Sequence, residues 1–161
     1  MVNTGPMEPL EITTPDDTTI LVRTSLAAPR SSVWRAWTTP DLIRRWWSGG
    51  FGEHTVADVD LRPGGAWRYV LLMADGGEVS FHGEYAEVVP FERLVWSEVY
   101  EGAPEEESTV VTAEFADAGE GTTALSVLIR SRDKANRDAV LASGFEAGLE
   151  SGYAVLEQLA S

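Results

Sequence analysis

Histidine and carboxylate side chains are the residues of this sequence that could move a proton or hold a metal ion. The two histidines, His54 and His82, are far apart and lack the H-x-x-x-H or H-x-H spacing of metal ligands. The chain has no cysteine, which excludes disulfides and thiolate metal sites. The G-x-S-x-G, Walker and dinucleotide-binding motifs are also absent from the sequence. We therefore expect neither a metal nor a cofactor.

Proton transfer is the catalytic chemistry for which candidate residues exist, namely His82 and Glu98. His82 would act as a general base only if its strand turned it inward beside Glu84 or Glu98. A histidine on a strand more often faces solvent or makes one structural hydrogen bond. Asp58 and Asp60 have the spacing of a carboxylate pair, but exposure beside the Gly-rich turn that follows is the favoured interpretation. These residues are compatible with an enzymatic function, but a non-enzymatic role is favoured.

The elements that would position these residues begin with a Trp-rich segment, Pro29 to Trp47. It holds four of the six tryptophans, a density typical of a core or a cavity wall. Pro29 and Pro40 suit the first positions of two short helices, and Thr39 can cap the second. One face of each helix is then apolar: Val33, Trp34 and Trp37 on the first, and Leu42, Ile43, Trp46 and Trp47 on the second.

Alternation of period two follows the Trp-rich segment and predicts an antiparallel meander. Thr18–Ala27 suits one earlier strand, and Leu10–Thr14 could add a short one. Gly- and Pro-rich turns separate the later strands, and the acidic segment 101–107 suits a solvated hairpin tip. The strands of the meander are expected near 54–61, 66–73, 78–89, 93–100, 108–116 and 122–130.

The end of the chain, from about Asp133 to Ala160, predicts one long helix with an apolar face of period three to four. Glycines 144, 148 and 152 form a stripe along it, and each costs roughly 1 kcal/mol of helix propensity relative to Ala. Two interpretations stay open. The stripe allows close packing of the helix on the sheet, or it leaves room for a ligand beside Phe145, Leu149 and Tyr153.

Composition restricts the partners. The 161-residue chain has a formal net charge of −14, which would repel nucleic acid and anionic membrane surfaces. No apolar run approaches the roughly 18 residues of a membrane span, and the N-terminus lacks the features of a signal peptide. We expect a cytoplasmic protein with a flexible tail at 1–17 and a single domain at 18–160.

The order of elements predicts an α+β domain whose curved sheet wraps around the terminal helix and leaves a cavity between them. Several short motifs occur in the same order and spacing as in a known family. They are Pro29, Val33-Trp34, Ala36, Thr38, Pro40, Trp46, Asp60–Gly65, Gly83–Tyr85, Glu87-Val88, Pro90, Glu92–Val95 and Gly121–Thr123.

With these motifs the chain resembles, from Thr18 to Ala160, the helix-grip, START-like (SRPBCC) superfamily. Within it, the closest resemblance is to the family named for the C-terminal domain of the heat-shock protein 90 ATPase activator. The resemblance implies a Bet v-like sheet of about six to seven strands, with two short helices after the first strand and a long C-terminal helix. The terminal helix of that family commonly carries Gly-Trp, where this chain has Gly148-Leu149. A smaller residue there would enlarge or reshape the floor of the cavity.

Strand alternation then selects the cavity wall. Trp67, Tyr69, Leu71 and Met73 share one face of their strand, opposite Arg68, and we expect that face to be concave. The next two strands have two candidate faces each, because a one-residue slip exchanges them. We expect the aromatic-rich faces to point inward: Phe81, Gly83 and Tyr85 on one, and Leu94, Trp96, Glu98 and Tyr100 on the other. The predicted ligand contacts are Trp46, Trp67, Tyr69, Phe81, Tyr85, Trp96, Phe145, Leu149 and Tyr153.

Three functions are compatible with this expectation. The favoured one is a module that binds a small hydrophobic or aromatic molecule, such as a lipid, a polyketide or a similar metabolite. The alternatives implied by the resemblance are a co-chaperone-like interaction module and a cyclase- or dehydratase-like enzyme that uses the same cavity. A homodimer would cover Trp34 or Trp47 if either were exposed.

Overall fold

The computed structural model describes residues 10–48, 52–104 and 107–161, and within these ranges the chain forms an α+β domain. Eight strands and four helices occur in these described ranges. In chain order they are β1 Glu11–Thr13, β2 Thr19–Leu26, α1 Arg30–Thr38, α2 Pro40–Trp46, β3 Gly52–Val59, β4 Ala66–Met73, β5 Glu78–Val89, β6 Arg93–Tyr100, β7 Thr109–Asp117, β8 Thr123–Arg130, α3 Lys134–Ala142 and α4 Phe145–Ala160.

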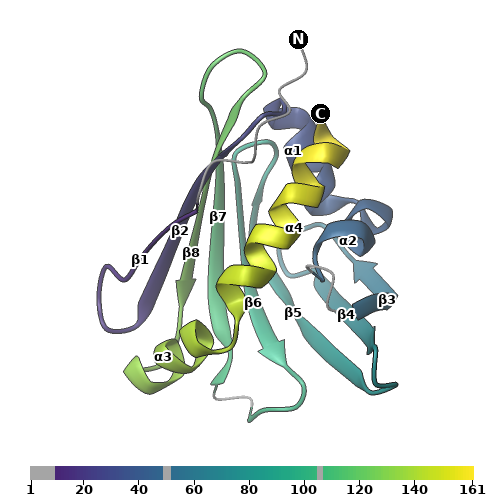
Figure 1. The fold of residues 1–161 in the computed structure, drawn as a ribbon, viewed down its shortest axis with the longest axis vertical. Helices are drawn as coiled ribbons and strands as arrows, with labels where there is room; N and C mark the ends of the chain where they lie inside the picture. Colours follow the sequence, from purple (N-terminus) through teal and green to yellow (C-terminus); the bar gives the residue numbers. More distant parts are fainter. Residues whose placement is uncertain (1–9, 49–51, 105–106) are drawn as a thin grey trace.

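The strands form one curved antiparallel sheet in the order β1-β2-β8-β7-β6-β5-β4-β3, and α4 crosses one face of it (Figure 1). Buried and exposed side chains alternate along β2. Ile20, Val22 and Leu26 are buried while Arg23 is exposed. The core therefore lies between the concave face of the sheet and the helices α1, α2 and α4. This is the helix-grip arrangement expected from the order of elements.

The strand count exceeds the expected six to seven, because the described part of the chain contains eight. The additional strand is β1, which lies in the segment 1–17 that was expected to be a flexible tail. It pairs with β2 through Ile12 opposite Val22, and the Ile12 side chain packs against the core. Residues 1–9 lie outside the described residues.

The two short helices form where the prolines predict them. Pro29 precedes α1 as its N-cap with ψ at 147°, one position earlier than expected, whereas Pro40 is the first residue of α2. Thr39 is the N-cap of α2, but its side chain makes no capping hydrogen bond. The indole Nε1 of Trp46 donates to the carbonyl of Ala36 at 2.8 Å, which joins α2 to α1. The expected helices are therefore present and fixed to each other.

The single long C-terminal helix predicted for 133–160 is wrong at its centre, because the chain forms two helices there. Gly144 adopts a left-handed conformation with φ at +82° and becomes the N-cap of α4. Ser143 ends α3, and its hydroxyl donates to the carbonyl of Val140 at 2.6 Å. Glycine adopts this backbone conformation without steric cost. Gly144 would weaken a continuous helix, and here it permits a sharp turn between two helices.

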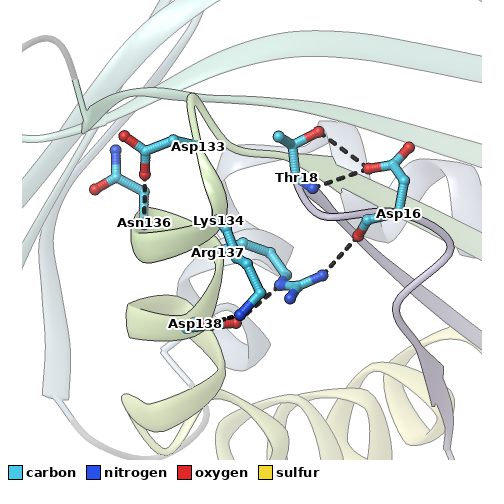
Figure 2. A network of polar contacts seen from close by, with 7 residues as sticks. All are labelled: Asp16, Thr18, Asp133, Lys134, Asn136, Arg137 and Asp138. Carbon is cyan, nitrogen blue, oxygen red and sulfur yellow. Dashed lines mark hydrogen bonds and ion pairs between the residues drawn. The ribbon is translucent and has the colours of Figure 1, made fainter.

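A polar network holds α3 in place (Figure 2). The carboxylate of Asp133 caps the helix by accepting from the backbone N–H of Asn136 at 2.9 Å. The buried guanidinium of Arg137 donates to the backbone carbonyl of Asp16 at 2.6 Å and to the carboxylate of Asp138 at 3.0 Å. The segment between β1 and β2 is thus tied to α3, which forms one wall of the cavity described below.

Candidate ligand-binding cavity

A cavity of about 550 Å³ lies between the concave face of the sheet and the helices α3 and α4. Side chains from β5, β6, β7 and β8 form one wall, and α1, α2, α3 and α4 form the other. The lining residues Trp37, Trp46, Trp96 and Tyr153 are buried and form the deep end. The lining residues Tyr100, Pro104, Glu107, Ala139 and Ser143 are exposed, so the cavity opens between α3 and the β6–β7 loop.

The deep end is a cluster of aromatic rings. Trp37 is at its centre, with ring centroids 4.8 Å from Trp46, 5.8 Å from Trp96 and 6.2 Å from Tyr153. These rings are tilted against one another, which is a favourable geometry for aromatic pairs. The helices α1, α2 and α4 and the strand β6 therefore all meet at Trp37.

The aromatic-rich faces of β5 and β6 point inward, as expected. On β5, Tyr85 is buried and Phe81 is half-buried, whereas Glu84 on the alternate face is exposed. On β6, the inward face carries Trp96 and then Glu98, which both line the cavity. The register of this strand pair shifts by one residue between Tyr85 and Glu87, so beyond the shift β5 turns Val88, opposite Leu94, toward the core.

The nine predicted ligand contacts fall into two groups. The lining group, six of the nine, borders the cavity and comprises Trp46, Phe81, Trp96, Phe145, Leu149 and Tyr153. The packed group of Trp67, Tyr69 and Tyr85 borders a space of only about 20 Å³, which is about the volume that one water needs. Trp67 is anchored there by a hydrogen bond from Nε1 to the carbonyl of Ser97 at 3.1 Å.

The lining residues outside the predicted contact set include three further aromatic side chains and one amide: Trp37, Trp47, Tyr100 and Asn136. The helical spacing that turned Trp37 toward the core was visible in the sequence, and Tyr100 shares its strand face with Trp96. Asn136 had no such signal, because the sequence predicted one continuous helix, whereas α3 is a separate helix that ends before the turn at Gly144.

Among the described lining residues, Glu98 is the carboxyl group inside the cavity, whereas Glu107 lies exposed at its opening. The Oε1 of Glu98 accepts a hydrogen bond of 3.4 Å from the indole Nε1 of Trp96, and its other carboxyl oxygen accepts none from the described residues. Burial raises the pKa of the Glu98 carboxyl above its ordinary value, and the Trp96 hydrogen bond opposes this only in part. A carboxyl group in this setting can hold a proton, donate it, or bind a cation.

The two histidines lie in opposite environments. His82 is on the outer face of β5, where its Nδ1 lies 3.1 Å from the carboxylate of Glu101, so it does not face the cavity. His54 on β3 is 5% exposed, and its ring packs edge-on against Trp47 and Tyr69. Burial lowers the pKa of His54 to about 4, which keeps its imidazole neutral near pH 7.

The remaining acidic candidates are on the surface. Asp58 and Asp60 are both exposed, and Asp60 pairs with Arg62 at 2.9 Å. Among the described residues, no group of three or more histidine and acidic side chains is placed to hold a metal ion. In the same part of the chain, no helix combines the length and apolar character that crossing a bilayer requires.

Trp34 is not exposed, so it gives no argument for a homodimer. Trp34 is 7% exposed and packs against Phe115 and Phe91, at centroid distances of 5.5 Å and 6.0 Å. Trp47 is half-buried, with its ring 4.9 Å from that of Tyr69 and 5.1 Å from that of Phe81. Both tryptophans are therefore covered largely within the chain.

Comparisons with solved structures agree with this architecture. A protein from Rhodobacter sphaeroides is 27% identical with a TM-score of 0.85, and the match covers 92% of this chain and 96% of that one. A protein from Nitrosomonas europaea is 25% identical with a TM-score of 0.81, covering 91% and 96%. CalU16 from Micromonospora echinospora is 27% identical with a TM-score of 0.61, covering 99% of this chain and 77% of that one.

A search of proteins with curated descriptions gave no match. The family model described as "Activator of Hsp90 ATPase homolog 1-like protein" matches residues 27–161, which is most of the domain. The match includes both Trp-bearing helices, β3 to β8 and the helices that line the cavity. The chain therefore belongs to the Activator of Hsp90 ATPase homolog 1-like family.

Proposed function

We propose that this protein binds a small, largely apolar molecule with aromatic character in the cavity between the sheet and α4. The observation that carries the proposal is the cavity itself. Protein interiors are packed as densely as organic crystals, so an open space of about 550 Å³ that reaches from the surface to the buried tryptophans is not a packing defect. Pockets of roughly 300–1,000 Å³ are the usual size for small-molecule sites.

The chemistry of the wall supports an apolar occupant. Tryptophans and aliphatic side chains dominate it, with Val111, Val127 and Ile129 contributed by the sheet. Rigid aromatic rings provide a large contact area at a low cost in side-chain entropy. The net charge of −14 supports a small-molecule partner rather than nucleic acid. The proposal includes a cytoplasmic location, which rests on the sequence alone.

Catalysis in the same cavity is a second candidate, because Glu98 faces the interior. A cyclase- or dehydratase-like reaction would need a group that moves a proton beside a substrate held in a reactive shape. His82 lies on the outer face of the sheet, so Glu98 alone would fill that role. If Glu98→Gln turned over an identified ligand as fast as the unaltered protein, Glu98 would be excluded as the group that moves the proton.

The first test is native mass spectrometry of the freshly purified protein together with titration of N-phenyl-1-naphthylamine, a neutral probe that fluoresces in apolar sites. We expect saturable binding of one probe per chain, or a co-purified small molecule that denaturation releases. Absence of both a released molecule and probe binding would contradict the proposal.

A pair of tryptophan substitutions localises the binding. Leu149 lines the cavity, and Leu149→Trp introduces the residue that the family commonly carries there. Loss of about 60 Å² of apolar contact corresponds to about 1.5 kcal/mol, or roughly tenfold weaker binding of the probe. Ala147→Trp is the matched control, because Ala147 is exposed on the same helix and does not line the cavity. Equal affinity in the two variants would show that the probe binds elsewhere.

A further inference from the structure

The charged side chains among the described residues of the cavity wall are all acidic. Glu98 and Glu107 are the charged side chains among its described lining residues, and no lysine, arginine or histidine of the described chain lines it. An anionic ligand would therefore enter without a counter-charge. Burial of an unpaired carboxylate or phosphate is strongly unfavourable in a low-dielectric site. Free fatty acids and other carboxylates do not match this wall.

The Glu98 carboxyl has fewer hydrogen bonds than a buried carboxyl can make. The Trp96 indole supplies one, at the long distance of 3.4 Å, and the second oxygen accepts none from the described residues. A carboxylate accepts several hydrogen bonds when it is fully satisfied. Burial raises the pKa of this carboxyl group, and the Trp96 hydrogen bond offsets only part of that shift. A ligand that brings N–H donors and a positive charge would supply what the protein does not.

The position of Glu98 suits the polar end of an otherwise apolar ligand. Along the inward face of β6 it lies between Trp96, in the deep aromatic cluster, and Tyr100, which is exposed at the opening. The apolar body of a ligand can therefore fill the deep end while its polar group stays beside Glu98.

We propose that the cavity selects an aromatic or otherwise apolar amine, bound as a cation with its ammonium group against Glu98. This inference rests on the proposed function, since it names the ligand class of the same cavity. The protein as a whole supports it, because a net charge of −14 and Glu107 at the opening attract cations and repel anions during approach.

The test compares three naphthalene probes of nearly equal size that differ in charge: 2-(1-naphthyl)ethylamine, 2-(1-naphthyl)ethanol and 1-naphthylacetate. Their affinities are measured by calorimetry, and by displacement of N-phenyl-1-naphthylamine, at pH 7 and physiological ionic strength. We expect the amine to bind at least tenfold more tightly than the alcohol, and the carboxylate to bind more weakly than both. This comparison uses the unaltered protein and needs no variant to fold.

Two variants separate the local contact from the general charge. Glu98→Gln keeps the shape of the side chain, and we expect it to weaken amine binding at least tenfold while alcohol binding changes less than twofold. Glu53→Gln is the control, because Glu53 is exposed on β3, does not line the cavity, and gives the same change in net charge. It should leave all three affinities unchanged.

The outcomes distinguish this inference from the proposed function. Equal binding of amine and alcohol, tighter binding of the carboxylate, or an amine preference that survives in Glu98→Gln would overturn the amine assignment while the cavity remains a binding site. If neither N-phenyl-1-naphthylamine nor any of the three probes binds, the proposed function fails and this inference fails with it.

Discussion

His54 makes the stability of this protein depend on pH in a range where most of its carboxylates are still ionised. The imidazole is 5% exposed, lies between the rings of Trp47 and Tyr69, and neither of its nitrogens has a hydrogen-bond partner among the described residues. Burial lowers its pKa from 6.5 to about 4; the charge of Arg44 acts in the same direction, while the backbone of Arg44 offsets part of the shift. The folded state therefore binds fewer protons than the unfolded state at any pH between these two values.

The sign and the size of the effect follow from proton linkage. A histidine whose folded pKa is lowered contributes stability that is present above pH 6.5 and is lost as the pH falls toward 4. Between pH 7 and pH 5 the free energy of unfolding should fall by about 2 kcal/mol through this residue, and by about 3 kcal/mol once the pH is below 4.

The assay is urea unfolding followed by tryptophan fluorescence at several pH values between 7 and 5. His54→Phe keeps an aromatic ring and removes the titrating group, so we expect it to abolish about 2 kcal/mol of the pH dependence. His82→Gln is the control, because it removes the other histidine of the chain, which lies outside this buried site on the surface beside Glu101. If the unaltered protein and His54→Phe lost stability equally between pH 7 and pH 5, the reasoning about His54 would be refuted.

Three further predictions concern stability. Glu98→Gln should raise the free energy of unfolding at pH 8, because burial raises the pKa of Glu98 and so disfavours its ionised form. This gain in stability should vanish as the pH falls below 4.5, the ordinary pKa of a glutamate. Urea titrations of both proteins at pH 8 and pH 4 measure the difference. Gly83→Ala should destabilise by about 3 kcal/mol, because the new Cβ would lie 1.7 Å from the backbone oxygen of Ser97; unchanged stability in thermal unfolding would contradict this. Arg137→Met should lower the free energy of unfolding by about 2 kcal/mol through loss of the charge-assisted bond to the Asp16 carbonyl, and wild-type urea resistance in this variant would count against it.

Local patterns were sufficient to predict most elements of the fold. Strand alternation and the turns after Val59 and Met73 placed β4, β5 and β6 at 66–73, 78–89 and 93–100, where the structure has them. These features depend on neighbours in the sequence: a pleated strand alternates its faces, and Gly and Pro end it. The inward faces of β5 and β6 followed for the same reason.

The division of the aromatic residues between cavity and core was decided by the tertiary structure. Trp67 and Trp96 both lie on inward strand faces, yet Trp67 packs into a filled cluster and Trp96 borders the open space. Which of the two occurs depends on the curvature of the sheet and its distance from the helices, and neither is encoded in the alternation of a single strand.

The break at Gly144 is a second feature that depended on tertiary contacts. From the sequence alone, the apolar period runs continuously from Leu141 to Leu156 and predicts one helix. The chain turns instead at Gly144, where glycine permits the left-handed backbone, and the bond from Arg137 to the carbonyl of Asp16 ties α3 to the segment before β2. The sequence by itself determined the family, the elements and their inward faces, since these follow from local periodicity. The volume of the cavity and the choice of aromatic residues that border it were decided by contacts between segments far apart in the chain.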